Sequence, residues 1–173
     1  RGNYEVYGRV RKADGSSVYS DTVRGKCGPI SNGEIISNGG FSCGEDDGWV
    51  LQTHESAQAS VEIFDDYYFE DPYYAFFEIT DGSTERWHIQ YSVTCPVDSG
   101  HQYEISFWAD ADDAKEIDVG MQENQDPWAT QMWETITIDG WDIYGPFEAF
   151  AQWDDPNNQF RFNVGGNTTN FYF

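Results

Sequence analysis

The chain has 173 residues with 9 Lys or Arg against 31 Asp or Glu, so its formal net charge at pH 7 is −22. This charge excludes nucleic-acid binding, which needs clustered Lys and Arg to neutralise phosphates, and it argues against anionic membranes and polyanionic glycans. No apolar run reaches the roughly 20 residues that span a bilayer. The expected partner is neutral or cationic and is not a membrane.

The first 26 residues differ in charge from the rest of the chain. They hold six basic and three acidic side chains, whereas residues 27–173 hold three basic and 28 acidic ones. Residues 4–10 alternate polar and apolar side chains, Asp14-Gly15 supplies a turn, and residues 18–23 return. We expect residues 1–26 to form an N-terminal β-hairpin or linker extension and residues 27–173 to form the main domain.

Short strand patterns then follow one another with turn signals between them, and no window shows an extended helical period. This spacing predicts an all-β protein, a β-sandwich. The predicted strands are residues 59–63, 74–79, 87–94, 103–108, 117–121, 135–138, 147–153 and 160–164. Residues 65–74, rich in Asp and Tyr, predict either a loop that presents tyrosines to a ligand or an acidic loop that tolerates calcium.

Three cysteines, Cys27, Cys43 and Cys95, fit neither zinc-ligand spacing nor a C-x-x-C redox motif. In a secreted chain the odd count suggests one disulfide and one free thiol. Cys27 with Cys43 closes the shorter loop, Cys43 with Cys95 is the alternative, and three buried free thiols are the third reading. The cysteines and the acidity favour a secreted, extracellular protein whose signal peptide has been removed.

Alternation within the strands separates an apolar face from a polar one. We expect Gln90, Gln122, Glu104, Arg161 and Trp108 to share the polar face. An exposed aromatic ring can stack on an apolar ligand face, and planar amides, carboxylates or Arg can bind polar groups through two hydrogen bonds. The polar face is therefore a candidate ligand-binding surface, and the alternative is cross-strand amide pairs beside a packed Trp.

Five segments, in order, carry a family pattern: residues 38–41 with Gly48-Trp49, residues 87–91, residues 99–109, residues 126–128 with 135–144, and residues 160–165. Together they resemble the "NGDFE…GW", "W-x-x-Q", "G-x-x-Y-x-x-S-F-x-A", "P-W-x…V-T-x-x-x-W-x-x-Y" and "L-x-F-x-x-G" motifs of carbohydrate-binding modules of the family 4, 9 and 22 type. The resemblance covers about residues 33–173. It implies a jelly-roll β-sandwich with a glycan chain on its concave face or loop rim.

The sequence departs from this pattern at positions that often help to hold calcium in the family. Gly40 and Ser42 replace its two acidic residues, and the chain stops at Phe173, before the usual acidic final strand. No cofactor is required for the expected function. The residues that would bind a metal are unknown, and whether the protein holds a structural calcium ion is left open.

The candidate ligand-binding residues are those on the polar face and the tryptophans at strand ends and in loops, where binding groups concentrate. They are Trp108, Trp87, Gln90, Gln122, Trp128, Trp49, Glu104 and Arg161. For Trp49 the alternative role is a core anchor, and Trp141 is expected to be structural.

An enzyme is the weaker interpretation. Glu116-Ile117-Asp118 resembles the start of the "E-I-D-x-E" strand of family 16 glucan hydrolases, but the next residue on that face is Gly120, so the second carboxylate is missing. We predict a non-catalytic module, monomeric and covalently linked to a glycoside hydrolase, that binds a neutral polysaccharide such as β-glucan, xylan or mannan. The alternatives are a small β-sandwich glycosidase or lyase and a structural or adhesion domain of a cell surface.

Overall fold

The computed structural model describes residues 9–11, 17–19, 35–36, 38–41, 44, 46–65 and 73–173. Twelve strands and one 3₁₀ turn are assigned in these residues: β1 (Arg9–Arg11), β2 (Ser17–Tyr19), β3 (Trp49–Thr53), β4 (Gln58–Asp65), β5 (Tyr73–Asp81), η1 (Arg86–His88), β6 (Ile89–Thr94), β7 (Gln102–Ala111), β8 (Lys115–Gln122), β9 (Thr130–Ile138), β10 (Asp142–Phe150), β11 (Gln159–Asn163) and β12 (Phe171–Tyr172). No described helix is long and apolar enough to cross a membrane.

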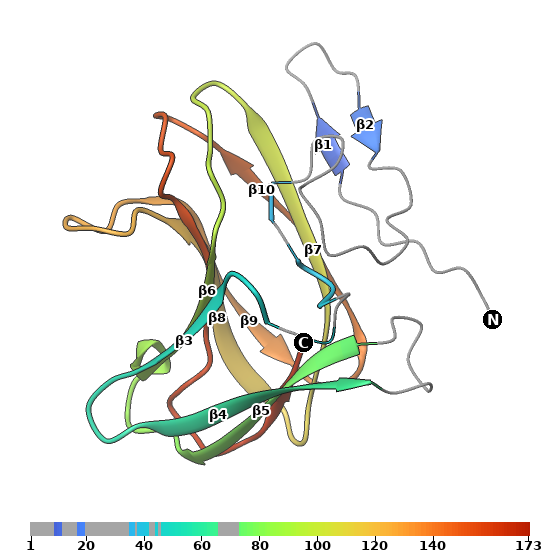
Figure 1. The fold of residues 1–173 in the computed structure, drawn as a ribbon, viewed down its shortest axis with the longest axis vertical. Helices are drawn as coiled ribbons and strands as arrows, with labels where there is room; N and C mark the ends of the chain where they lie inside the picture. The colour runs from blue at the N-terminus through green and yellow to red at the C-terminus, as the bar shows by residue number, and fades with distance from the viewer. Residues whose placement is uncertain are drawn as a thin grey trace.

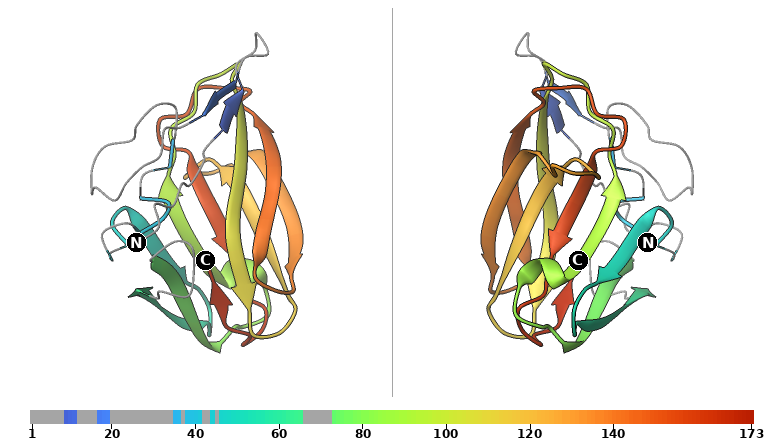
Figure 2. Two further views of the ribbon diagram at one scale, coloured as in Figure 1. Left: turned by 90° about the vertical axis from the view of Figure 1, so that its right-hand side faces the viewer. Right: turned by 90° about the vertical axis from the view of Figure 1, so that its left-hand side faces the viewer.

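The strands form two antiparallel sheets that pack face to face (Figures 1 and 2). One sheet has five strands in the order β3-β6-β11-β8-β9. The other has seven: the path β2-β1-β7-β12-β5-β4, with β10 on the other edge of β7. This is a β-sandwich of the jelly-roll type, as the sequence predicts.

Alternation explains why these segments become strands that are apolar on one face. On β6, Ile89, Tyr91 and Val93 point into the sandwich and are almost fully buried, as are Phe160 and Phe162 on β11. The seven-stranded sheet supplies the opposing layer. Its buried core residues include Ala75, Phe77, Ile79, Tyr103, Ile105, Phe107, Ala109, Ala149 and Phe171.

Trp49 lies in this core and not at a binding surface. It is 5% exposed, and its ring stacks on Tyr91 with centroids 4.8 Å apart and planes 13° apart. Its Nε1 donates a hydrogen bond to the backbone oxygen of Asn38, so the one polar atom of the indole is satisfied. The structure therefore supports the core-anchor alternative for Trp49 and not its role as a ligand-binding residue.

All eight strands predicted between residues 59 and 164 are present, with shifted ends. The prediction missed β3 and β12, which are only five and two residues long. In the described part of residues 1–26, β1 pairs with β2, and Arg11 pairs with Gln102 at the start of β7 (Figure 1). The division of the chain at residue 26 stays a prediction. The turn between β1 and β2 and most of residues 65–74 lie outside the described residues.

Cys95 is a buried free thiol, so the alternative that pairs it with Cys43 is wrong. It accepts a hydrogen bond from Nδ2 of Asn158, and burial raises the pKa of the thiol to about 12. Cys27 and Cys43 lie outside the described residues.

Candidate functional site

The outer face of the five-stranded sheet carries two rows of side chains that cross all five strands, on the opposite side from the core, and a shorter row beside them that contains Gln122 and Gln159. Strand register sets each row, because residues paired across antiparallel strands point to the same face. We call these rows the outer polar face. The first row is Val50, Ser92, Arg161, Gly120 and Trp133, and the second is Gln52, Gln90, Asn163, Asp118 and Thr135.

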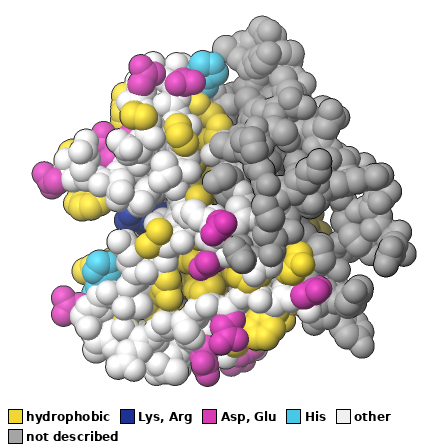
Figure 3. Space-filling model, viewed as in Figure 1, with side chains coloured by type: hydrophobic (Ala, Val, Ile, Leu, Met, Phe, Trp, Pro, Cys, Tyr) yellow, Lys and Arg dark blue, Asp and Glu magenta, His cyan; other side chains and the backbone are white. Residues whose placement is uncertain are grey.

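The middle of this face is recessed. Its polar residues would be exposed on a flat outer sheet, yet Gln90, Ser92, Asp118, Arg161 and Asn163 are all buried. Figure 3 shows a notch at the left-hand edge of the molecule with a Lys or Arg side chain at its bottom. In the same view, Figure 1 places the β8–β9 loop above this notch and the β3–β4 loop below it. The polar side chains therefore line the floor of a groove.

Arg161 lies in the middle of the floor and is bound by neutral amides. Its Nη1 donates to Oε1 of Gln122 at 3.3 Å and its Nη2 donates to Oε1 of Gln159. Burial lowers the pKa of the guanidinium, and no carboxylate of the described residues forms an ion pair with it. Within that part of the chain, Nε of Arg161 and Oγ of the neighbouring Ser92 are buried without a hydrogen-bond partner. An unsatisfied buried donor is costly, so the polar groups of this part of the floor are not fully satisfied by their neighbours in the described residues.

Trp133 forms an aromatic platform at the β9 end of the first row. Gly120 pairs with Trp133 across β8 and β9, and a Cβ at position 120 would lie 2.3 Å from Cε3 of the indole. The ring therefore lies directly on the backbone of Gly120, in space that only glycine leaves open. Trp133 remains 37% exposed, so a flat apolar surface faces the solvent beside Arg161.

Trp128, in the β8–β9 loop, lies at one end of the strands that form the floor. It is 47% exposed, and its backbone φ is +58°, a left-handed conformation that is strained for a bulky residue. Nε2 of Gln122 donates to the backbone oxygen of Trp128 at 2.8 Å, while Oε1 of Gln122 receives the bond from Arg161. Three predicted residues, Trp128, Gln122 and Arg161, are thus connected by hydrogen bonds.

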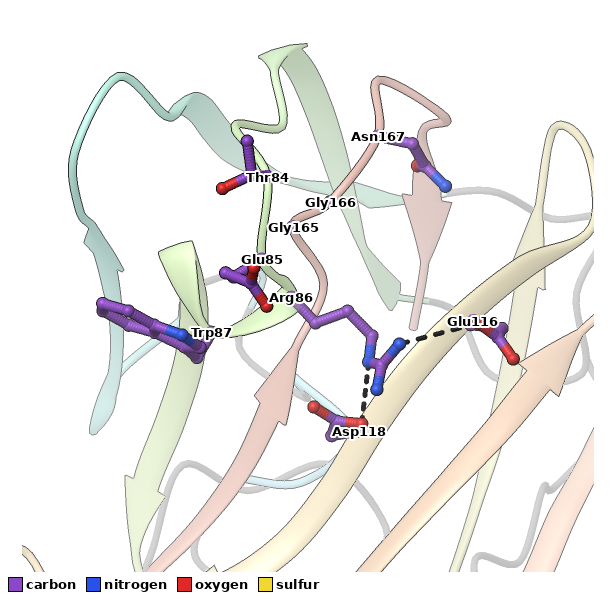
Figure 4. Close-up of a pocket in the computed structure, with 9 residues that line it drawn as sticks. All are labelled: Thr84, Glu85, Arg86, Trp87, Glu116, Asp118, Gly165, Gly166 and Asn167. Carbon is purple, nitrogen blue, oxygen red and sulfur yellow. Dashed lines mark hydrogen bonds and ion pairs between the residues drawn. The ribbon is translucent and has the colours of Figure 1, made fainter.

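Trp87, in η1, lies at the opposite end of these strands. It is 46% exposed and packs against the rings of His54 and His88. Gln90 follows on β6, where its Nε2 donates to Oδ1 of Asn163. Beside Trp87 is a polar cavity of about 230 Å³, drawn in Figure 4.

Two predicted residues lie elsewhere. Trp108 and Glu104 are on β7, in the seven-stranded sheet, and their side chains point to the outer face of that sheet. Trp108 stacks on Trp141 with centroids 5.4 Å apart and planes 13° apart. The expectation that they share a face with Gln90, Gln122 and Arg161 is wrong, because alternation assigns a side chain to the inner or outer side of its own sheet and cannot say which sheet that is.

The sequence analysis missed Trp133, although the signal was available. Alternation on β9 places Thr135 and Thr137 on one face, and continuing it two residues toward the N-terminus reaches Trp133. Ser92, Asn163 and Asp118 lie on the same outer face and are not among the residues that the sequence singles out as candidates. Their burial on the floor depends on the walls, which the strand pattern does not reveal.

The described residues show no cluster of acidic side chains that would indicate a calcium site. No group of three or more His, Cys, Asp or Glu in that part of the chain is arranged to hold a metal ion. Of the two positions where the family pattern has acids, Gly40 offers no side-chain oxygen, and Ser42 is not among the described residues.

The fold and the groove define a β-sandwich binding module, and the comparisons identify its family. A family model described as a carbohydrate binding domain, CBM_4_9, matches residues 33–173. The chain therefore belongs to this family of carbohydrate-binding modules, as its motifs predict. No curated protein matches the sequence significantly.

Solved structures agree with this assignment. A family 4 module, described under "CBM4 structure and function", is 29% identical with a TM-score of 0.63, over 80% of this chain and 94% of that one. A family 61 module in complex with β-1,4-galactotriose is 15% identical with a TM-score of 0.55, over 80% and 92%. The N-terminal cellulose-binding domain of a Cellulomonas fimi β-1,4-glucanase is 12% identical with a TM-score of 0.51, over 74% and 85%. The last two show the fold alone.

Proposed function

We propose that the outer polar face binds a neutral polysaccharide of the β-glucan, xylan or mannan class. The observation that carries the proposal is the pairing of the exposed Trp133 ring with the recessed polar floor beside it. A pyranose ring needs an apolar platform for its C–H face and fixed polar groups for its hydroxyls, and these two needs are met on adjacent strands. The exposed rings of Trp87 and Trp128 lie at the two ends of the same strands.

The charge distribution supports a neutral ligand. Arg86, Lys115 and Arg161 are the only basic side chains of residues 27–173, against 28 acidic ones, and all three lie in or beside the five-stranded sheet. An anionic polymer would meet a strongly negative molecule at long range, whereas a neutral chain pays no such penalty.

We further propose that the protein acts outside the cell as a monomeric module joined to a glycoside hydrolase, with no cofactor in the binding step. Tethering an enzyme to its polymeric substrate raises its effective concentration there without new contacts in the active site. The motif pattern and the family support a role in binding without catalysis.

The test is affinity electrophoresis through gels that contain laminarin, barley β-glucan, xylan, glucomannan or hydroxyethylcellulose. Trp133→Ala and Trp108→Ala form a matched pair, since both tryptophans are 37% exposed on the outer face of a sheet. We expect one or more polymers to retard the wild type, Trp133→Ala to lose about tenfold or more in affinity, equivalent to about 1.4 kcal/mol, and Trp108→Ala to bind like the wild type.

Two results would contradict the proposal. Retardation that is lost in Trp108→Ala and kept in Trp133→Ala would move the site to the seven-stranded sheet. No retardation in any gel would favour a structural or adhesion domain.

A further inference from the structure

A side pocket opens next to the groove, beyond the ends of the strands that form its floor. It is lined by residues 84–87 before β6, by Glu116 and Asp118 at the start of β8, and by residues 165–167 after β11 (Figure 4). Its volume is about 230 Å³, below the range of sites that enclose a drug-sized ligand, so it suits one sugar ring and not an oligosaccharide.

The side pocket is continuous with the outer polar face through two shared residues. Asp118 belongs to the second row of the floor and also lines the pocket, and Trp87 lies at the end of the floor and also lines the pocket. The rows run across the strands, whereas the pocket is displaced from them along the strands. A polymer that follows the rows would therefore pass the mouth of the pocket.

The side pocket has fixed hydrogen-bonding groups and one exposed ring. Nε of Arg86 donates to Oδ1 of Asp118 at 2.8 Å, and Nη1 lies 3.5 Å from Oε2 of Glu116. Asp118 also accepts a hydrogen bond from Thr135, so its position is fixed from two sides. The carboxylate of Glu116 is 65% exposed and remains available to accept hydrogen bonds from hydroxyls.

The charges of the side pocket favour a neutral ring. The guanidinium of Arg86 is neutralised by Asp118, and the pocket also contains the carboxylates of Glu85 and Glu116. Within the described part of the chain, a uronic acid would therefore face an excess of negative charge, because Arg86 is already paired with Asp118 and Lys115, which contacts Asn167 of the pocket, has no exposed surface. A neutral pyranose or furanose can bind the carboxylates through its hydroxyls and stack against the indole of Trp87.

From this geometry we infer that the side pocket is a subsite for a single neutral sugar that branches from the main chain held on the outer polar face. The inference rests on the proposed function, since it needs a main chain in the groove. It makes the protein selective for substituted polymers, because the branch adds contacts that a linear chain does not have.

The experiment compares binding of a linear oligosaccharide with its singly branched counterpart by isothermal titration. The pairs are a cello-oligosaccharide against its singly xylosylated form, a manno-oligosaccharide against its galactosylated form, a xylo-oligosaccharide against its arabinosylated form, and a β-1,3-gluco-oligosaccharide against one with a single glucose branch. We expect the branched member of one pair to bind at least tenfold more tightly. Glu116→Phe places a ring in the pocket mouth and should reduce that preference to about one, with linear binding unchanged.

Glu148→Phe is the matched control, because Glu148 is an exposed glutamate on β10, on the outer face of the other sheet. It should keep the preference. If Glu116→Phe fails to fold, Glu116→Gln tests the same pocket and should lower the preference severalfold. Equal affinity for both members of every pair, or a preference that Glu116→Phe leaves intact, overturns the branch subsite while the proposed function stands. Absence of binding to linear and branched sugars alike overturns both.

Discussion

Burial of the charged Lys115 side chain lowers the stability of the folded protein, and the size of this effect can be worked out from the structure. It is the first residue of β8 and has no exposed surface, and its Nζ donates to Oδ1 of Asn167, a neutral partner. No carboxylate of the described residues forms an ion pair with it. Burial lowers the pKa of Lys115 from 10.5 to about 8. A difference of this size corresponds to about 3 kcal/mol of destabilisation wherever the folded protein carries the protonated lysine.

The sign of the pH dependence follows from proton binding. Between pH 8 and 10.5 the unfolded chain holds the lysine proton and the folded protein has largely lost it, so the free energy of unfolding rises with pH through this range. Below pH 8 both states are protonated and the full cost is present. Cys95 acts in the opposite direction: its pKa is raised from 9.0 to about 12, so the stability it contributes is lost as the pH rises above 9. The wild-type curve alone therefore mixes the two effects.

Lys115→Met separates them, because both proteins keep Cys95. We expect the variant to be more stable than the wild type by about 3 kcal/mol at pH 7 and by only about 1 kcal/mol at pH 9.5. Asn167 keeps a partner in the variant, since its Oδ1 also accepts the backbone N–H of Thr169. The assay is urea unfolding followed by tryptophan fluorescence at pH 7.0, 8.5 and 9.5, with the slopes compared to confirm that the transition is unchanged. A stability difference that does not vary with pH, or a variant less stable than the wild type at pH 7, would refute the reasoning.

Two further substitutions test the core and the platform. Trp49→Ala removes a buried ring that packs on Tyr91 and should lower the free energy of unfolding by about 3–5 kcal/mol. Trp108→Ala, at a partly exposed position, should cause a much smaller loss. Equal losses of the two variants in urea titrations would contradict the core position of Trp49. Gly120→Ala puts a methyl group against Trp133 and should weaken polysaccharide retardation in affinity gels by displacing the ring, whereas Gly140→Ala, with nothing within 4 Å of its added Cβ, should bind normally. Equal binding by the two glycine variants would argue that the position of the Trp133 ring does not matter.

Much of the fold could be predicted because most strands are long enough to show alternation. β4 to β8 and β11 each repeat apolar residues at every second position, or carry a continuous apolar run. β12 was not predicted, because two residues cannot show an alternation. Its place between β5 and β7 depends on long-range pairing of Phe171 with Phe77 and Ala111.

The candidate site was predictable only within each strand. Gln90, Gln122 and Arg161 were correctly assigned to one face, because their strands are neighbours in the same sheet. Trp108 follows the same local pattern on β7 yet lies on the other sheet, and only the order of the strands distinguishes the two cases. The side pocket could not be predicted at all, since it joins η1, β8 and the segment after β11, which are separated in the sequence.

The gathering of Arg86, Lys115 and Arg161 at one sheet also affects how many copies can occupy one polymer. Each copy carries a formal charge of −22, and those of the 28 carboxylates of residues 27–173 that lie away from this sheet have no basic side chain from the same part of the sequence to offset them. Copies bound at adjacent positions therefore repel each other over about 10 Å at 0.1 M salt, and over longer distances at lower ionic strength. The spacing of bound molecules along a polysaccharide is thus set by the salt concentration as well as by the length of the groove.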